Sequence, residues 1–207
     1  MIRSLPTPDA LVGRIPLLWR MLAAMLVLSG LILMLVESRA RILRSGVEIR
    51  LQTAPVDPRD LFRGDYVVLG YTIGRLDTTK LAGDKTFARD QWVYVRVAPG
   101  AGGFAEARGV YRAFPPVGAG ETVLKARVLS TSCARDEGGI FDCAKGVSSL
   151  NVAYGLESYF VPQGTGLAIE RTERARIEVV AAVDASGAAA IKRLLIDGKR
   201  VHDEPPY

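Results

Sequence analysis

The stretch from Leu17 to Val36 reads LLWRMLAAMLVLSGLILMLV, and its apolar side chains limit what this chain can fold into more than any other feature. At about 1.5 Å per helical residue, some twenty residues span roughly 30 Å, the thickness of a bilayer core. Arg20 can reach the headgroups from one turn inside, and Trp19 suits the interfacial belt. The sequence therefore predicts a transmembrane anchor helix and its extension over residues 15–44.

A cleaved signal peptide is the alternative interpretation of this stretch. Its apolar core would be shorter and would end at a small-x-small site, whereas the sequence ESRAR follows here at Glu37–Arg41. We therefore expect an uncleaved anchor that places Leu17 to Val36 in the lipid bilayer. Pro6, Pro8 and Asp9 precede it, and residues 1–14 are predicted to be a disordered lead.

Arginines flank the apolar stretch in similar numbers on both sides, so the positive-inside rule does not set its orientation. Cys133 and Cys143 offer another indication, because Gly138-Gly139 between them suits a turn and the spacing suits a disulfide at the end of a β-hairpin. Such bonds persist in oxidising compartments. Two unrelated buried thiols are the alternative. We expect the bulk of the chain to be extracytoplasmic, with the N-terminus inside.

After Gly46 the apolar period changes from helical to alternating, which is the pattern of half-buried strands. The chain is expected to be mainly β, an antiparallel, strand-rich domain with one short helix over residues 46–200, plus the one N-terminal transmembrane helix. Residues 201–207 are predicted to be a tail, and the short helix is expected behind Thr165, with a further helical turn around Thr79 to Ala82. The predicted strands cover residues 47–52, 65–73, 92–97, 106–114, 122–130, 148–154, 157–161, 177–183 and 188–196.

Composition excludes several classes of function. The chain has two cysteines and one histidine, His202, whereas even a catalytic zinc site needs at least three protein ligands. A net charge of +5, without a run of Lys or Arg interleaved with aromatic residues, does not indicate a nucleic-acid groove. We therefore predict no metal site, no cofactor and no nucleic-acid partner.

The segment Ala54 to Ile73, APVDPRDLFRGDYVVLGYTI, concentrates backbone-constraining and charged residues. Clustered carboxylates of Asp57, Asp60 and Asp65 could bind a divalent cation. The structural interpretation is that these residues hydrogen-bond their own turns and pair with neighbouring arginines. Gly64 suits a positive φ at the entry to a strand. Because both faces of residues 65–73 are largely apolar, the sequence predicts a central, buried strand.

The residues Gly64 to Tyr71, GDYVVLGY, resemble the bacterial GDYXXLXY family, which is named for that string. PVDPRDLFR before it and YFVPQG at 159–164 are also similar to that family, so the likeness covers about residues 46–198. The resemblance implies a small protein, without an assigned activity, anchored in the bacterial cytoplasmic (inner) membrane by a single pass. It also implies a polytopic membrane protein as a partner, because such proteins are encoded beside one another.

A weaker resemblance supports an enzyme hypothesis. Leu61 to Val68 is similar to the segment that follows the serine motif of type I signal peptidases, but Val56 stands at the nucleophile's place. Lys125 is similar to their lysine-base segment, yet a base without a nucleophile does no acyl chemistry. The alternative function is thus a signal-peptidase-like scaffold, or a hydrolase that uses the carboxylates above or Lys125 with Ser130.

We favour a non-catalytic binding or accessory module for a membrane-protein or envelope partner over an enzyme. Its contact surface is expected at the loop 55–63 and the motif that follows. The candidate residues are Asp57, Arg59, Asp60, Arg63, Gly64, Asp65, Tyr66, Leu69 and Tyr71.

Overall fold

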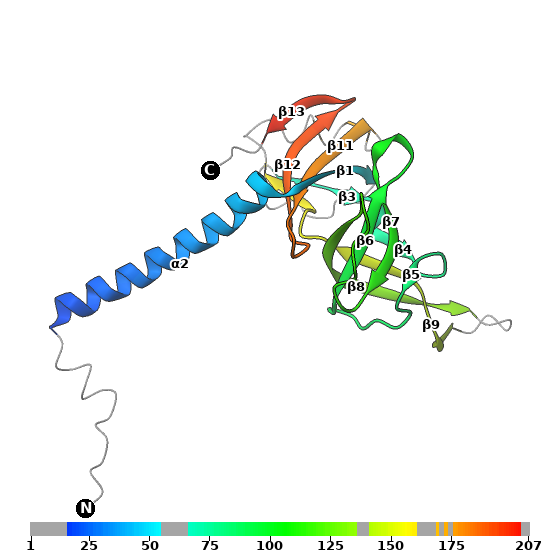
Figure 1. Cartoon of the computed structure of the whole chain (residues 1–207), viewed down its shortest axis with the longest axis horizontal. Coiled ribbons are helices and arrows are strands. Elements are labelled where there is room, and N and C mark those ends of the chain that lie inside the picture. Colours follow the sequence, from blue (N-terminus) through cyan, green and yellow to red (C-terminus); the bar gives the residue numbers. More distant parts are fainter. Residues whose placement is uncertain are drawn as a thin grey trace, which may run out of the picture. The chain divides into compact units, whose positions relative to one another are not determined.

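The computed structural model describes residues 16–54, 66–135, 141–160, 169, 172–173 and 176–203. Contacts divide the chain into two compact units, the first ending at Ala40 and the second beginning at Arg41. Strands make up 50% of the structure and helices 24%. The prediction of a strand-rich domain with one N-terminal apolar helix is confirmed (Figure 1).

Helix α2 runs from Leu17 to Ser45, slightly beyond the predicted end. It is long and apolar enough to cross a membrane, a test that a signal sequence would also pass, and none of its most apolar window is buried inside the protein. The helix leads directly into a strand at Gly46, whose amide donates to the Ile42 carbonyl at 2.9 Å. A Cβ at Gly46 would lie 2.6 Å from that oxygen and 2.8 Å from the Val183 nitrogen, so the junction leaves no room for a side chain.

A five-stranded sheet follows the helix, with the strand order β13-β12-β11-β1-β3. Asp184 closes the predicted hairpin between β11 and β12, because its carboxylate accepts the amides of Ser186 at 2.8 Å and Ala188 at 3.0 Å. Asp197 and Gly198 turn the chain with positive φ into β13, which carries the sheet to Asp203. The strand bounds are β1 Val47–Ala54, β3 Gly70–Tyr71, β11 Ile177–Val183, β12 Ala189–Ile196 and β13 Lys199–Asp203.

The six-stranded sheet has the order β4-β9-β8-β6-β7-β5, antiparallel except for the short β5–β7 pair. The expected helical turn around Thr79 to Ala82 is wrong. The Asp77 carboxylate accepts the amide of Thr79 at 3.1 Å, which makes a turn, and β5 follows that turn. The strand bounds are β4 Arg75–Asp77, β5 Ala82–Gly83, β6 Trp92–Pro99, β7 Ala105–Tyr111, β8 Thr122–Arg135 and β9 Phe141–Ala153.

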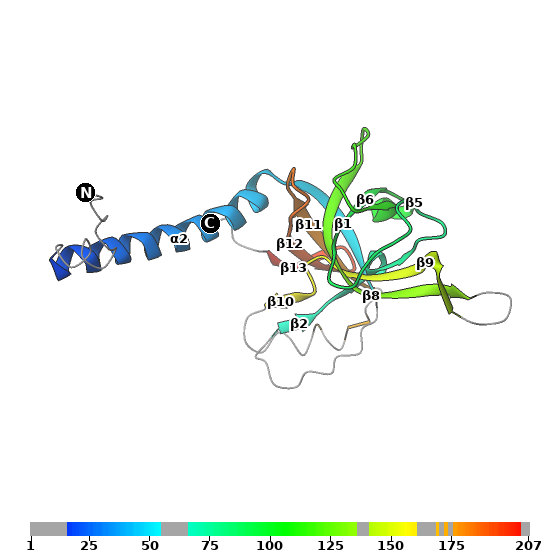
Figure 2. The ribbon, with the colours of Figure 1, turned by 90° about the horizontal axis from the view of Figure 1, so that it is seen from below.

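A two-stranded sheet of β2 (Tyr66–Val68) and β10 (Ser158–Phe160) completes the described strands (Figure 2). One hydrophobic core joins all three sheets, and its fully buried side chains include Leu51, Val67, Leu124 and Leu194. The short helix predicted behind Thr165 falls largely outside the described residues.

The predicted central strand over 65–73 is wrong in two respects. The segment is divided into β2, β3, the 3-10 turn η1 (Thr72–Gly74) and β4, and these strands pair with β10, β1 and β9 respectively. It divides because the amide of Leu69 donates to the Glu157 carbonyl at 2.8 Å and the chain passes from one sheet to another. Only one face is buried: Leu69 and Ile73 lie in the core, whereas Thr72 is exposed.

Candidate binding groove

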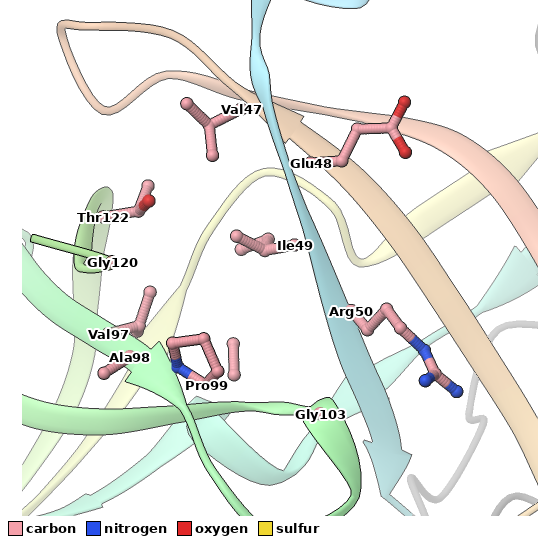
Figure 3. A pocket seen from close by; sticks show the side chains of 11 residues that line it. Val47, Glu48, Ile49, Arg50, Val97, Ala98, Pro99, Gly103, Gly120 and Thr122 are labelled. Carbon is pink, nitrogen blue, oxygen red and sulfur yellow. The ribbon is translucent and has the colours of Figure 1, made fainter.

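A groove of about 290 Å³ lies between the start of β1, the end of β6 and the start of β8 (Figure 3). It begins at Val47, two residues after helix α2 ends. Val97 and Pro99 of β6 and Thr122 of β8 line the opposite wall, with Gly103, Ala105 and Gly120 around its rim. The small residues on this wall leave the space open.

The alternation of β1 sorts its side chains into two sets. Val47 and Ile49 point across the groove toward β6 and Thr122, whereas Glu48 and Arg50 point away from it (Figure 3). Val47 is 59% exposed although it is a valine in a strand, because nothing in the described structure covers it. The groove therefore presents an apolar surface to a ligand.

Both charged side chains at the groove are held by ion pairs on its far side. Lys192 binds the Glu48 carboxylate at 2.8 Å, and Arg193 also pairs with it. The hydrogen bond from Lys192, followed by that from Arg193, lowers the pKa of Glu48 despite partial burial. Arg50 binds Glu178 at 2.7 Å and stands 4.9 Å from the centre of the Phe104 ring.

The edge of β1 that faces the groove is open at its start. On one side, β1 pairs with β11 from Val47 to Gln52. On the other side, β3 pairs only with Thr53 and Ala54, and a single bridge joins Arg50 to Phe104. Within the described structure, Val47 and Glu48 thus have no strand partner on that edge. An open strand edge beside an apolar cavity suits the binding of an extended segment through main-chain hydrogen bonds.

The groove has little catalytic chemistry to offer. Of its lining residues only Thr122 carries a hydroxyl, and the carboxylate nearest to it in the lining belongs to Glu48, which is bound to Lys192 and Arg193. A nucleophile needs an adjacent base within hydrogen-bond reach. The arrangement is therefore better suited to binding than to group transfer.

A second cavity, of about 450 Å³, lies beside β4 and β7 and is polar at its rim. Its charged residues pair with one another, Lys80 with Asp77 at 3.2 Å and Arg108 with Glu106 at 3.1 Å. These four side chains are exposed by 46% or more, so the pairs contribute little to stability. No observation directs a ligand to it.

The residues predicted for a contact surface fall into three sets. Those of the loop, namely Asp57, Arg59, Asp60, Arg63, Gly64 and Asp65, lie outside the described residues, and so does the cation site considered for them. Tyr66 begins β2, but its side chain lies outside the described part as well. Leu69 and Tyr71 are 1% and 5% exposed, so they belong to the core and present no surface.

Tyr71, the last tyrosine of the motif, takes part in a pair of buried hydrogen bonds between two distant segments, which the sequence did not reveal. Its hydroxyl donates to the Leu156 carbonyl at 2.7 Å, while the Tyr154 hydroxyl donates to the Ile73 carbonyl at 2.8 Å. Burial, followed by the charge of Glu157, raises the pKa of both phenols. The motif tyrosine therefore connects residues 70–74 to the turn at 154–157 through buried hydrogen bonds.

Glu157 holds that turn from the other side. Its carboxylate accepts the amides of Tyr154 at 2.6 Å and Gly155 at 2.9 Å, and Gly155 adopts a positive φ of 77°. The spacing Tyr-Gly-x-Glu is a turn signal that could have been found in the sequence. The hydrogen bond between this turn and Tyr71, far away along the chain, could not have been found there.

Lys125 and Ser130, the proposed base and nucleophile, are not brought together. They are five positions apart on β8, roughly 16 Å along a strand. The Lys125 ammonium lies 4.8 Å from the centre of the Trp92 ring, and the Ser130 hydroxyl accepts a hydrogen bond from Asn151 at 2.8 Å. The Ser/Lys alternative thus has no geometric support.

The two cysteines lie on neighbouring strands. Cys133 of β8 pairs with Val147, and Ala134 pairs with Asp142, so a register shift places the backbone of Cys143 in the irregular part of β9. The side chain of Cys143 lies outside the described part. The disulfide stays a prediction.

A model of the family described as GDYXXLXY protein matches residues 28–194, which includes half of the apolar stretch and most of the β-domain. The comparisons with curated proteins and with solved structures each found no match.

Proposed function

This chain belongs to the GDYXXLXY protein family, and from that premise we propose that it is a membrane-anchored, non-catalytic binding module. Leu17 to Val36 anchors it by a single pass in a bacterial inner membrane, with the β-domain on the periplasmic side. The groove beside β1 binds an extended apolar segment of a membrane-protein partner. The open, apolar edge at Val47 is the observation that carries this proposal.

The position of the groove along the chain supports a partner that shares the bilayer. The groove starts at Val47, and Gly46 joins it to the last turn of α2 without a linker. Effective concentration is high when two binding elements are held close by their tethers. A membrane protein that presents an extracytoplasmic segment near its own helices would meet the groove at such a concentration.

Main-chain pairing explains how a groove with few polar side chains could still be selective. A strand added at the free edge of β1 would satisfy its backbone groups, and alternate side chains would enter the apolar cavity beside Ile49 and Val97. A cavity of about 290 Å³ lies near the small end of the range for ligand sites. It therefore favours one or two apolar side chains of a segment over a large ligand.

Site-specific photo-crosslinking in intact cells tests this proposal. A photoreactive residue is placed at Val47 and, as a matched control, at Val201 of β13, which is 46% exposed on the same sheet. We expect a crosslinked membrane protein from position 47 and none from position 201. Equal crosslinking at both positions, or none from position 47 in a stably expressed variant, would count against the groove.

A further inference from the structure

The outer surface of the six-stranded sheet carries aromatic and basic side chains in register. Trp92 of β6 lies opposite Arg127 of β8, and Tyr94 lies opposite both Lys125 of β8 and Tyr111 of β7. Directly opposed residues of antiparallel strands project from the same face. The intervening Val93, Val95, Leu124 and Ala126 are fully buried, which directs the first set outward.

We call this surface the aromatic–basic face, and it consists of Trp92, Tyr94, Tyr111, Phe114, Lys125 and Arg127. Two of its rings are open to solvent, with Trp92 55% and Phe114 46% exposed. The Phe114 ring meets Tyr94 edge to face at a centroid distance of 5.4 Å, and Lys125 stands over Trp92. The rings are thus ordered by their neighbours rather than scattered singly.

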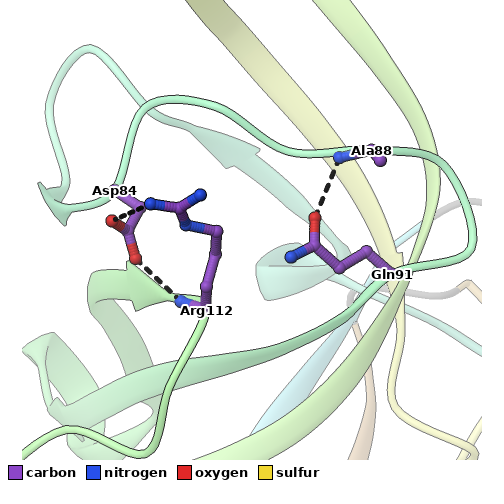
Figure 4. Close-up of polar contacts among 4 residues, drawn as sticks. All are labelled: Asp84, Ala88, Gln91 and Arg112. Carbon is purple, nitrogen blue, oxygen red and sulfur yellow. Dashed lines mark hydrogen bonds and ion pairs between the residues drawn. The ribbon is translucent and has the colours of Figure 1, made fainter.

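The segment before β6 fixes the start of this face. The Gln91 side chain accepts the Ala88 amide at 3.0 Å, and the Asp84 carboxylate accepts the Arg112 amide at 2.8 Å (Figure 4). The first contact holds Gln91, which directly precedes Trp92 at the start of β6, and the second joins Asp84 to the residue that follows β7. A preorganised ring loses less conformational entropy when a ligand stacks on it.

Two cations of this face, Lys125 and Arg127, have little negative charge close to them. Arg96 faces Glu121 at 3.6 Å, and Arg112 faces Asp84 at 3.5 Å. Among the described residues, Arg127 forms an ion pair with Asp90 alone, at 3.9 Å, and both side chains are more than half exposed. No carboxylate of the described residues forms an ion pair with Lys125. The aromatic–basic face therefore attracts anions.

We propose that the aromatic–basic face binds an anionic polysaccharide, with sugar rings on Trp92 and Phe114 and carboxylates at Lys125 and Arg127. The C–H faces of sugar rings pack on aromatic π-faces, whose charge is negative. A nucleic acid would bind chiefly through its phosphates, with an affinity that grows with the number of cations in contact, and this face offers two. A purely acidic peptide would leave the exposed rings without a partner.

Trp92 provides a direct readout, because the chain has two tryptophans and the other, Trp19, lies in α2. The full chain carrying Trp19→Phe is placed in phosphatidylcholine nanodiscs, and the emission of Trp92 is followed during titration. The probes are oligogalacturonate, maltohexaose as uncharged rings, oligoglutamate as charge without rings, and oligothymidylate as a polyphosphate that carries stackable bases. We expect oligogalacturonate to change the emission saturably, the tightest of the four, and high salt to weaken it.

Charge variants separate specific contact from general attraction. Lys125→Gln with Arg127→Gln should lower the affinity for oligogalacturonate by about two- to thirtyfold, the range for two exposed ion pairs. Lys199→Gln on β13 removes an exposed charge from the other sheet and should leave the affinity unchanged. The proposal is overturned if oligogalacturonate gives no saturable change, if oligoglutamate or oligothymidylate binds as tightly, or if Lys199→Gln has the same effect. The face shares no residue with the groove, so this test is independent of crosslinking at Val47.

Discussion

At the residue scale, the described residues of the family motif stabilise the fold rather than form a ligand site. Leu69 fills the core, and the hydroxyl of Tyr71 satisfies a buried carbonyl across the chain at Leu156. A buried polar group left without a partner costs about 1–3 kcal/mol. Residues of this kind are constrained by folding, whereas the two proposed binding surfaces lie at Val47 and on the outer rings.

The first prediction concerns the buried hydrogen bond of Tyr71 and the pH dependence of its contribution to stability. Tyr71→Phe leaves the Leu156 carbonyl unpaired and should lower the free energy of unfolding by about 1–3 kcal/mol at neutral pH. Tyr94→Phe, on the half-exposed outer face, is the matched control and should cost less. Urea unfolding of the solubilised full chain, followed by near-UV circular dichroism, measures both. Equal losses would show that Tyr71 contributes only through its ring.

The sign of the pH effect follows from the raised pKa of both buried phenols. The unfolded chain loses their protons above the ordinary pKa of 10.0, while the folded chain retains them. This contribution is fully present below pH 10 and is lost as pH rises further. Above pH 10, each buried phenol reduces the free energy of unfolding by about 1.4 kcal/mol for every unit by which the pH rises, because only the unfolded chain releases the proton. Tyr71→Phe should therefore show a shallower alkaline decline than the wild type.

At the scale of elements, the two cysteines give the second prediction. Asp142, the residue before Cys143, pairs with Ala134, the residue after Cys133, and we expect a disulfide that closes the β8–β9 hairpin. Loop-closure entropy suggests a contribution of roughly 2–3 kcal/mol. Mass measurement of protein alkylated under non-reducing conditions should show no modified thiol. Two alkylated cysteines in protein isolated from cells would remove both the bond and the argument for an oxidising compartment.

The sequence predicted the regular elements well, because their periods are local. The alternation of Val47, Ile49 and Leu51 identified β1, and the Asp184 turn identified the β11–β12 hairpin. The division of residues 65–73 could not be predicted, because it depends on the Glu157 carbonyl and the Tyr154 hydroxyl, which lie more than eighty positions away.

The groove could not be predicted from the sequence either, because it too depends on contacts between distant segments. Its walls, β1 and the end of β6, are far apart in sequence, and only the pairing register shows that β3 leaves the start of β1 unpaired on one edge. The aromatic–basic face was visible in part, since Trp92 and Tyr94 alternate with the apolar Val93 and Val95. What the sequence lacked was the register that adds Lys125 and Arg127 from β8.

At the scale of the whole molecule, both proposed binding surfaces depend on where the β-domain resides. A retained anchor would keep the proposed groove near membrane proteins, and a periplasmic location would expose the aromatic–basic face to envelope polysaccharides. If the apolar stretch were a cleaved signal sequence, the domain would be released, and the tethering argument for the groove would fail. The fate of Leu17 to Val36 therefore decides between two different modes of action.

The last prediction is that the anchor is retained and that the domain faces outward. Peptide mapping of protein extracted from membranes should recover peptides from both sides of the Leu17 to Val36 stretch, because this stretch is longer than the roughly 7–15 apolar residues of a signal-peptide core. Protease added to spheroplasts should digest the β-domain, while a cytoplasmic marker protein stays intact as the control. A mature N-terminus within or after Glu37–Arg41 would establish cleavage. Protection of the β-domain until the membrane is lysed would place it in the cytoplasm, and the polysaccharide could then not reach Trp92.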